Sequence, residues 1–168
     1  RQVIHLTTQM NSPLGLLSLL LAVMTTSCTN DSKLHRWRFS GPIEVRAFRI
    51  NWENKVSFDP ILSPDEVLNP TRIPEAGIIL TDKQVAKLET AVTGTHPERP
   101  EADCFWPHHA FVFYNGSGEI VGQINICFLC SNHSHSGEPS GLAGSWDFDE
   151  LAKLVTDIGL PIQNSNWK

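Results

Sequence analysis

Three cysteines in one stretch of the chain could bind a metal or form a disulfide. Cys127 and Cys130 form a Cys-x-x-Cys pair, and Cys104 precedes them on a separate segment. His108 and His109 lie between Cys104 and this pair. Thiolates and imidazoles are the ligands that zinc prefers, whereas two thiols can instead oxidise to a disulfide. Either chemistry requires a fold that brings distant cysteines together.

A β-hairpin over this stretch would do so. Residues 110–114 and 120–128 are rich in aromatic and β-branched side chains, and the sequence Asn-Gly-Ser-Gly at 115–118 between them is typical of a turn. With Asn115 opposite Gly118, antiparallel pairing places Cys104 within a residue or two of both Cys127 and Cys130.

The same register divides the hairpin into two faces, because opposed residues point to the same side. One face is apolar and is expected to be the core face; it carries Phe105, His109, Phe111, Phe113, Ile120, Ile124, Ile126 and Phe128. The other is far more polar and carries His108, Tyr114, Glu119, Gln123, Asn125 and Cys127.

The sequence leaves three interpretations of the cysteines open. In the first, Cys104, Cys127 and Cys130 bind zinc together with one histidine, His108 or else His133 or His135, in a closed structural site. In the second, Cys104 forms a disulfide with Cys127 or Cys130 and closes the open end of the hairpin.

The third interpretation is thiol–disulfide chemistry at Cys127 and Cys130. Redox-active pairs of this kind usually precede a helix, and here a Ser/Gly loop follows instead. His109, on the core face, is expected to be a buried histidine bonded to backbone more than a ligand. His133 and His135 in the following loop are secondary candidates that could fold back.

Composition excludes some partners. The chain has 168 residues, a net charge of −5 and a pI near 5.8, with lysines and arginines scattered singly. Neither a basic stripe for nucleic acid nor a polybasic membrane patch is present in the sequence.

An apolar run at 14–24 is too short to span a bilayer as a helix and fits the h-region of a secretory signal. A buried helix of a cytosolic protein is the alternative. The residues that follow, Thr25-Thr26-Ser27-Cys28, resemble the lipobox of bacterial lipoprotein signal peptides. That resemblance implies cleavage before Cys28 and a lipid on its sulfur. It also implies an outer-membrane location facing the periplasm, since Asp does not follow Cys28.

We therefore expect a signal peptide at 1–27, a lipidated tether at 28–40 and a single domain at 41–168. Within the domain, the pattern predicts a strand at 42–52 and a second strand or hairpin return at 55–58. A loop is expected at 73–77, and a short strand or the start of a helix at 78–80.

Two amphipathic helices are expected. One begins at Thr81 with a capping box to Gln84 and ends at Gly94; the other begins near Asp147 and ends at Gly159. Residues 131–145 are expected to form a loop. The predicted fold class is therefore α+β, a small antiparallel sheet with a central hairpin packed against two helices.

The pattern Cys…Pro-His-His-Ala-Phe-Val-Phe-Tyr…Ile-Cys-Phe-Leu-Cys, followed by a helix ending Leu-Gly-Leu-Pro, is similar to uncharacterised bacterial lipoproteins and secreted proteins over about 80–162. This resemblance implies a setting but no activity. The expected function is a non-enzymatic binding or structural module with bound zinc or a disulfide, held at the membrane through Cys28. A redox protein is the alternative, and a protein partner is not identified by the sequence.

Overall fold

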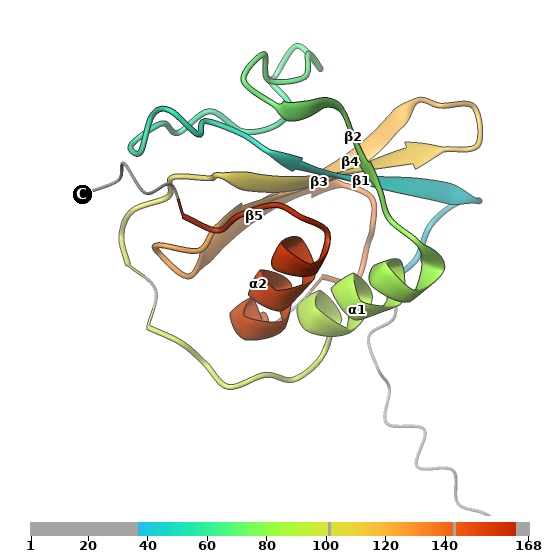
Figure 1. The fold of residues 1–168 in the computed structure, drawn as a ribbon. Helices are drawn as coiled ribbons and strands as arrows, with labels where there is room; N and C mark the ends of the chain where they lie inside the picture. The colour runs from blue at the N-terminus through green and yellow to red at the C-terminus, as the bar shows by residue number, and fades with distance from the viewer. Residues whose placement is uncertain (1–36, 101, 143, 164–168) are drawn as a thin grey trace, which may run out of the picture. The chain divides into compact units, whose positions relative to one another are not determined.

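The computed structural model describes residues 37–100, 102–142 and 144–163. The sequence-predicted signal peptide and Cys28 lie outside these residues. Five antiparallel strands form one sheet in the order β2-β1-β3-β4-β5, and two helices cover one of its faces (Figure 1). The α+β prediction is confirmed at this level. No helix among the described residues is long and apolar enough to cross a membrane.

The hairpin lies at the centre of the sheet, formed by β3 (His109–Asn115) and β4 (Ile120–Cys127). Its register differs from the predicted one by two residues, with Ala110 paired to Asn125. The turn accounts for one residue of the difference, because Asn115 bonds to Glu119 around a three-residue loop in which Gly118 adopts a φ of 82° that favours glycine. A bulge, where the register shifts between Phe113 and Tyr114, accounts for the second. A shift of two leaves each side chain on its predicted face.

Ile120 is an exception. The register shifts between Phe113 and Tyr114, so Ile120 pairs with Tyr114 and packs with Ala110 and Val112. It therefore lies on the face opposite to the predicted one, because the bulge reverses the alternation of β4 at this point.

Two edge strands were missed. β2 (Ile73–Ile79) covers the segment predicted as a loop at 73–77, and β5 (Asn132–Gly137) lies within the loop predicted at 131–145. Main-chain pairing with β1 (Ile43–Arg49) and β4 defines these strands. The side chains of β5 lack the apolar alternation on which a sequence-based assignment rests. Residues 55–58, predicted as a second strand or hairpin return, form no strand: 55–56 lie in a turn and 57–58 are irregular.

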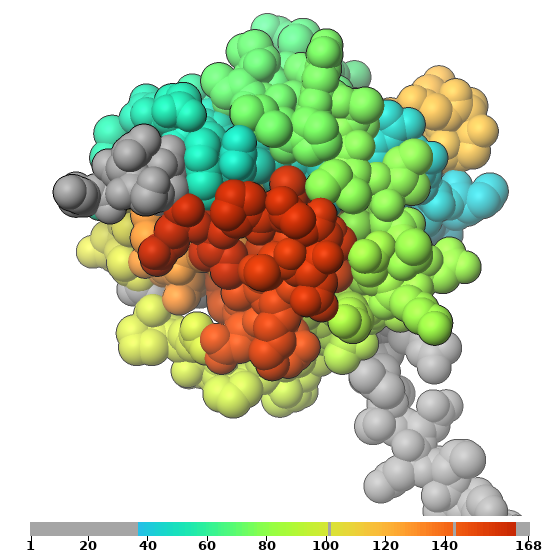
Figure 2. All heavy atoms as spheres, in the orientation of Figure 1, coloured from blue at the N-terminus to red at the C-terminus, as the bar shows by residue number. Residues whose placement is uncertain are grey.

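Helix α1 (Asp82–Thr93) begins as predicted, since the Gln84 side chain accepts a hydrogen bond from the Thr81 N–H at 2.8 Å. Helix α2 (Phe148–Asp157) is capped by Asp147, whose carboxylate accepts hydrogen bonds from the N–H groups of Asp149 and Glu150. In the space-filling view of Figure 2, α2 lies beside α1. Their apolar side chains join those of β1, β3 and β4 in the larger core, which includes Leu88, Val92, Phe111, Ile124, Leu151 and Val155.

The other face of the sheet is covered by residues 50–72, an irregular segment opposite to the helices (Figure 1). A second, smaller core of Phe48, Ile50, Ile61, Ala110, Val112 and Tyr114 lies beneath it. The predicted polar face of the hairpin is thus buried, and its polar side chains form hydrogen bonds with the segment 50–72. Asn125 Oδ1 accepts from the Ile61 N–H at 2.7 Å, and Gln123 Oε1 accepts from the Leu62 N–H at 3.0 Å.

Replacement of Asn125 tests this attachment. Asn125 is 1% exposed, so Asn125→Ala leaves the buried Ile61 N–H without its acceptor. We expect a loss of about 1–3 kcal/mol in the free energy of unfolding, measured by urea denaturation. Ser134→Ala, which removes only a 3.4 Å contact to the same amide, should change it by less than about 0.5 kcal/mol. Equal midpoints for the two variants would contradict this account.

Candidate functional site

A disulfide closes the open end of the central hairpin. It joins Cys104, on the segment that enters β3, to Cys130, in the turn after β4, with 6.0 Å between their Cα atoms. The main chain adds a bond beside it, from the Ala102 N–H to the Cys130 carbonyl at 3.1 Å. Of the three interpretations of the cysteines, this geometry corresponds to the second, and Cys130 is the partner of Cys104.

Cys127 is a free, fully buried thiol at the last residue of β4. Burial raises its pKa, while main-chain hydrogen bonds from Trp106, Cys130 and Leu129 act in the opposite direction. The net raised pKa keeps the sulfur protonated at neutral pH. A protonated, buried thiol is a poor nucleophile, so this cysteine lacks the activation typical of a redox-active pair.

His108 lies on the same face of the hairpin as Cys127, as predicted, but its ring contacts the segment 50–72 that covers this face. Its Nε2 lies 3.2 Å from the Lys55 carbonyl oxygen, which can only accept a hydrogen bond. Burial lowers the pKa of His108, so the neutral ring donates through Nε2. This histidine therefore helps to attach the segment 50–72 to the sheet.

His109 points to the helix side and is fully buried. Its Nε2 donates to the Pro161 carbonyl at 2.9 Å, and its ring packs edge-on against Phe128 with centroids 5.0 Å apart. Burial lowers its pKa to about 3. The structure thus agrees with the expectation of a buried histidine bonded to backbone.

His133 and His135 both lie on β5, where their rings stack 6.3 Å apart. His133 also stacks on Trp146 with 3.6 Å between the centroids, and burial lowers its pKa to about 4. The two secondary candidates, His133 and His135, thus have ring contacts with Trp146. Within the described part of the chain, no three His, Cys, Asp or Glu side chains are placed to hold a metal ion.

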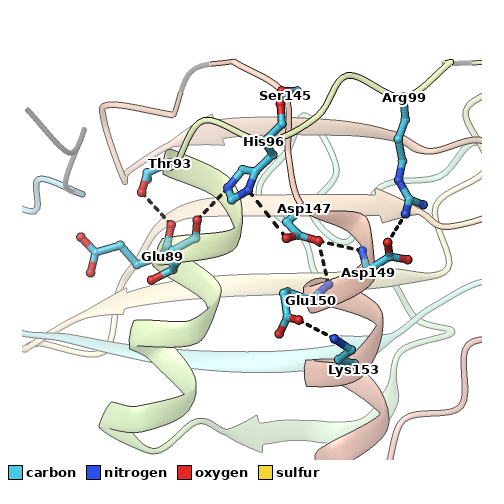
Figure 3. A network of polar contacts seen from close by, with 10 residues as sticks. Glu89, Thr93, His96, Arg99, Ser145, Asp147, Asp149, Glu150 and Lys153 are labelled. Atoms are coloured by element: carbon cyan, nitrogen blue, oxygen red, sulfur yellow. Dashed lines mark hydrogen bonds and ion pairs between the residues drawn. The ribbon is translucent and has the colours of Figure 1, made fainter. Parts of the chain in front are cut away.

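Sequence reasoning missed a polar network between the helices, shown in Figure 3. His96 follows α1, and its Nδ1 lies 3.7 Å from the Asp147 carboxylate, while its Nε2 lies 2.9 Å from the Thr90 carbonyl. Ser145 donates to the main-chain carbonyl of His96 and not to the ring. Serine, histidine and aspartate therefore meet here without the hydroxyl–imidazole bond that activates a nucleophile. No pairwise spacing in the sequence indicates this contact.

Comparison of the chain with family models, with curated proteins and with solved structures gives no match.

The disulfide should contribute measurably to stability. Cys104 and Cys130 are 26 positions apart, and in the chain-entropy model a loop of that length stabilises the fold by about 3.5 kcal/mol. We expect Cys104→Ser and Cys130→Ser to lower the free energy of unfolding by about 2–4 kcal/mol each, and the double variant by no more than either single one. Wild type with reductant should match them, and a wild type indifferent to reductant would refute the bond.

Acid should destabilise the fold through His109. A folded pKa of about 3 lies below the usual 6.5, so the unfolded chain binds the proton first as pH falls. The stabilisation is complete above about pH 6.5 and falls by roughly 1 kcal/mol per pH unit below it, towards pH 3. Urea midpoints of wild type and His109→Gln at pH 7, 6 and 5 test this, and His135→Gln is the control. Parallel pH profiles for wild type and His109→Gln would contradict it.

Proposed function

We propose that this chain is a lipid-anchored, extracytoplasmic binding module. In this proposal residues 1–27 are a signal peptide, Cys28 carries the lipid, and the domain is held at the outer membrane, facing the periplasm. The observation that supports the proposal most is the Cys104–Cys130 disulfide.

The disulfide indicates in which cellular compartment the protein folds. Disulfides persist in oxidising environments and are rare where glutathione and thioredoxin keep thiols reduced. Here the bond links the segment before β3 to the turn after β4, 26 positions apart, and it restricts the conformations of the unfolded chain. A structural disulfide of this kind supports export of the chain, in accord with the lipobox-like sequence that ends at Cys28.

The state of the nucleophilic side chains favours binding over catalysis. The raised pKa of Cys127 keeps its thiol protonated, and the Ser145 hydroxyl is directed to a main-chain carbonyl. Neither side chain is activated by a neighbouring base. The sheet face that carries His108, Gln123 and Asn125 uses its polar groups to hold an irregular segment in place, as binding proteins do when they present loops on a rigid scaffold.

Zinc binding or thiol exchange by the reduced protein is the second candidate. Main-chain N–H groups of Cys130 and Leu129 already bond to the Cys127 sulfur, an arrangement that also stabilises a thiolate. Reduction of the disulfide would free Cys104 and Cys130 to join Cys127, with His108 as the predicted fourth ligand. Metal analysis of anaerobically reduced protein tests it: about one zinc per chain would support this candidate, and its loss in Cys127→Ala would assign the site.

The anchor is tested by lipid labelling. We expect a bacterium that expresses the full chain with radiolabelled palmitate to incorporate label into the protein and to retain it in the membrane fraction. Cys28→Ala should abolish both, because the sulfur is the acceptor. Cys127→Ala, which removes a buried thiol, is the matched control and should keep the label. An unlabelled wild type, or a labelled Cys28→Ala variant, would refute the lipid anchor.

A further inference from the structure

Two histidines lie side by side on β5, the strand at one edge of the sheet (Figure 1). His133 and His135 are two positions apart, so both side chains point to the same side of the strand. Their partners on β4 are Ile126 and Ile124, which both belong to the larger core. The two imidazole rings therefore lie on the helix side of the sheet, where their planes differ by 15° and their centroids are 6.3 Å apart.

The ring of His133 is held in place by aromatic side chains. It stacks on Trp146 with 3.6 Å between the centroids, and the ring of Phe148 lies 6.3 Å away. Trp146 is only 3% exposed, so it is a fixed support for the imidazole. The Nδ1 atom of His133 is buried without a hydrogen-bond partner among the described residues, which leaves Nε2 as the nitrogen that solvent can reach. His133 thus presents one nitrogen in a fixed position.

The protonation state and the exposure of the two rings suit them as metal ligands. Burial lowers the pKa of His133 to about 4, and the charge of a protonated His135 acts in the same direction. At pH 7 the His133 ring is therefore neutral, and its lone pair is available to a metal ion without the loss of a proton. His135 is exposed, and exposed side chains change rotamer within nanoseconds, so its ring can turn towards His133.

The spacing of the rings is compatible with one shared metal ion. Two imidazoles bound to one ion, with metal–nitrogen distances of about 2.1 Å, have centroids roughly 4.5–6.3 Å apart. The observed 6.3 Å is at the upper end of this range, and a small rotation of His135 shortens it. Imidazole binds zinc, copper and nickel, and among the divalent ions Cu²⁺ has the highest affinity for nitrogen ligands. Within the described ranges no third His, Cys, Asp or Glu completes a metal-binding group, so the other coordination positions are open to water.

We infer that His133 and His135 form a two-histidine site for Cu²⁺, in which one nitrogen of each ring binds the ion and the stack on Trp146 fixes the first ring. The inference goes beyond the proposed anchoring and does not rest on it. It also differs from the zinc candidate, because the cysteine site requires reduction of the disulfide whereas this pair is present in the oxidised protein. Lipid labelling, zinc analysis of reduced protein and copper titration of oxidised protein can therefore each fail while the others hold.

Titration calorimetry of the oxidised full chain with CuCl₂ at pH 7 tests the inference, on protein purified without a histidine tag. We expect about one Cu²⁺ per chain, with a Kd of roughly 1–100 µM. His135→Gln and His133→Gln should each weaken this binding at least about tenfold, because a single imidazole lacks the effective concentration of the second one. The electron paramagnetic resonance spectrum of the bound Cu²⁺ should show coupling to two imidazole nitrogens, and both variants should lose this pattern.

His96→Gln is the matched control, since it removes a histidine that lies between the helices and not on β5. It should leave the affinity unchanged, and so should Cys127→Ala, which removes the free thiol. Thermal melting shows whether each variant is folded, and the exposed His135→Gln carries the test if His133→Gln does not fold. No binding at about 1 mM Cu²⁺ would overturn the inference. So would an affinity that the β5 variants leave intact, or that either control lowers equally.

Discussion

Two side-chain amides hold an irregular segment onto a regular sheet, and much of the structure depends on this contact. The main-chain N–H groups of Ile61 and Leu62 donate to side chains of the sheet, so that Asn125 and Gln123 supply the acceptors that a neighbouring strand would otherwise supply. The Asn125 amide also donates to Gln123 Oε1 at 3.1 Å, so the two side chains form one connected unit. A buried main-chain donor left without a partner costs free energy, and this unit is what allows residues 50–72 to cover the sheet.

The two faces of the sheet are covered by different physical means. On one face, α1 and α2 bury a broad apolar surface, and hydrophobic burial dominates. On the other, a smaller apolar core is supplemented by directed polar contacts from His108, Gln123 and Asn125. A helix covers a face with its own hydrogen bonds satisfied internally. An irregular segment cannot, so it depends on polar side chains from the sheet.

The features that sequence predicted well are those with local causes. The capping box at Thr81, the stop at Gly94, the N-cap at Asp147 and the hairpin at 115–118 each follow from a few neighbouring residues. The approach of Cys104 to Cys130 followed from the hairpin and survived the two-residue error in register, because that error changes no face.

What sequence missed depends on contacts between distant segments. The strand β5 is defined by pairing with β4, and its small polar side chains carry no period-two apolar pattern. Its Gly137 faces Gly122, where an added Cβ would lie 1.7 Å from the Glu138 carbonyl oxygen, so close backbone packing replaces side-chain packing there. Likewise the sequence places Asn125 and Gln123 on the more polar face of the hairpin, but nothing in the local sequence indicates that a segment more than fifty residues earlier covers them.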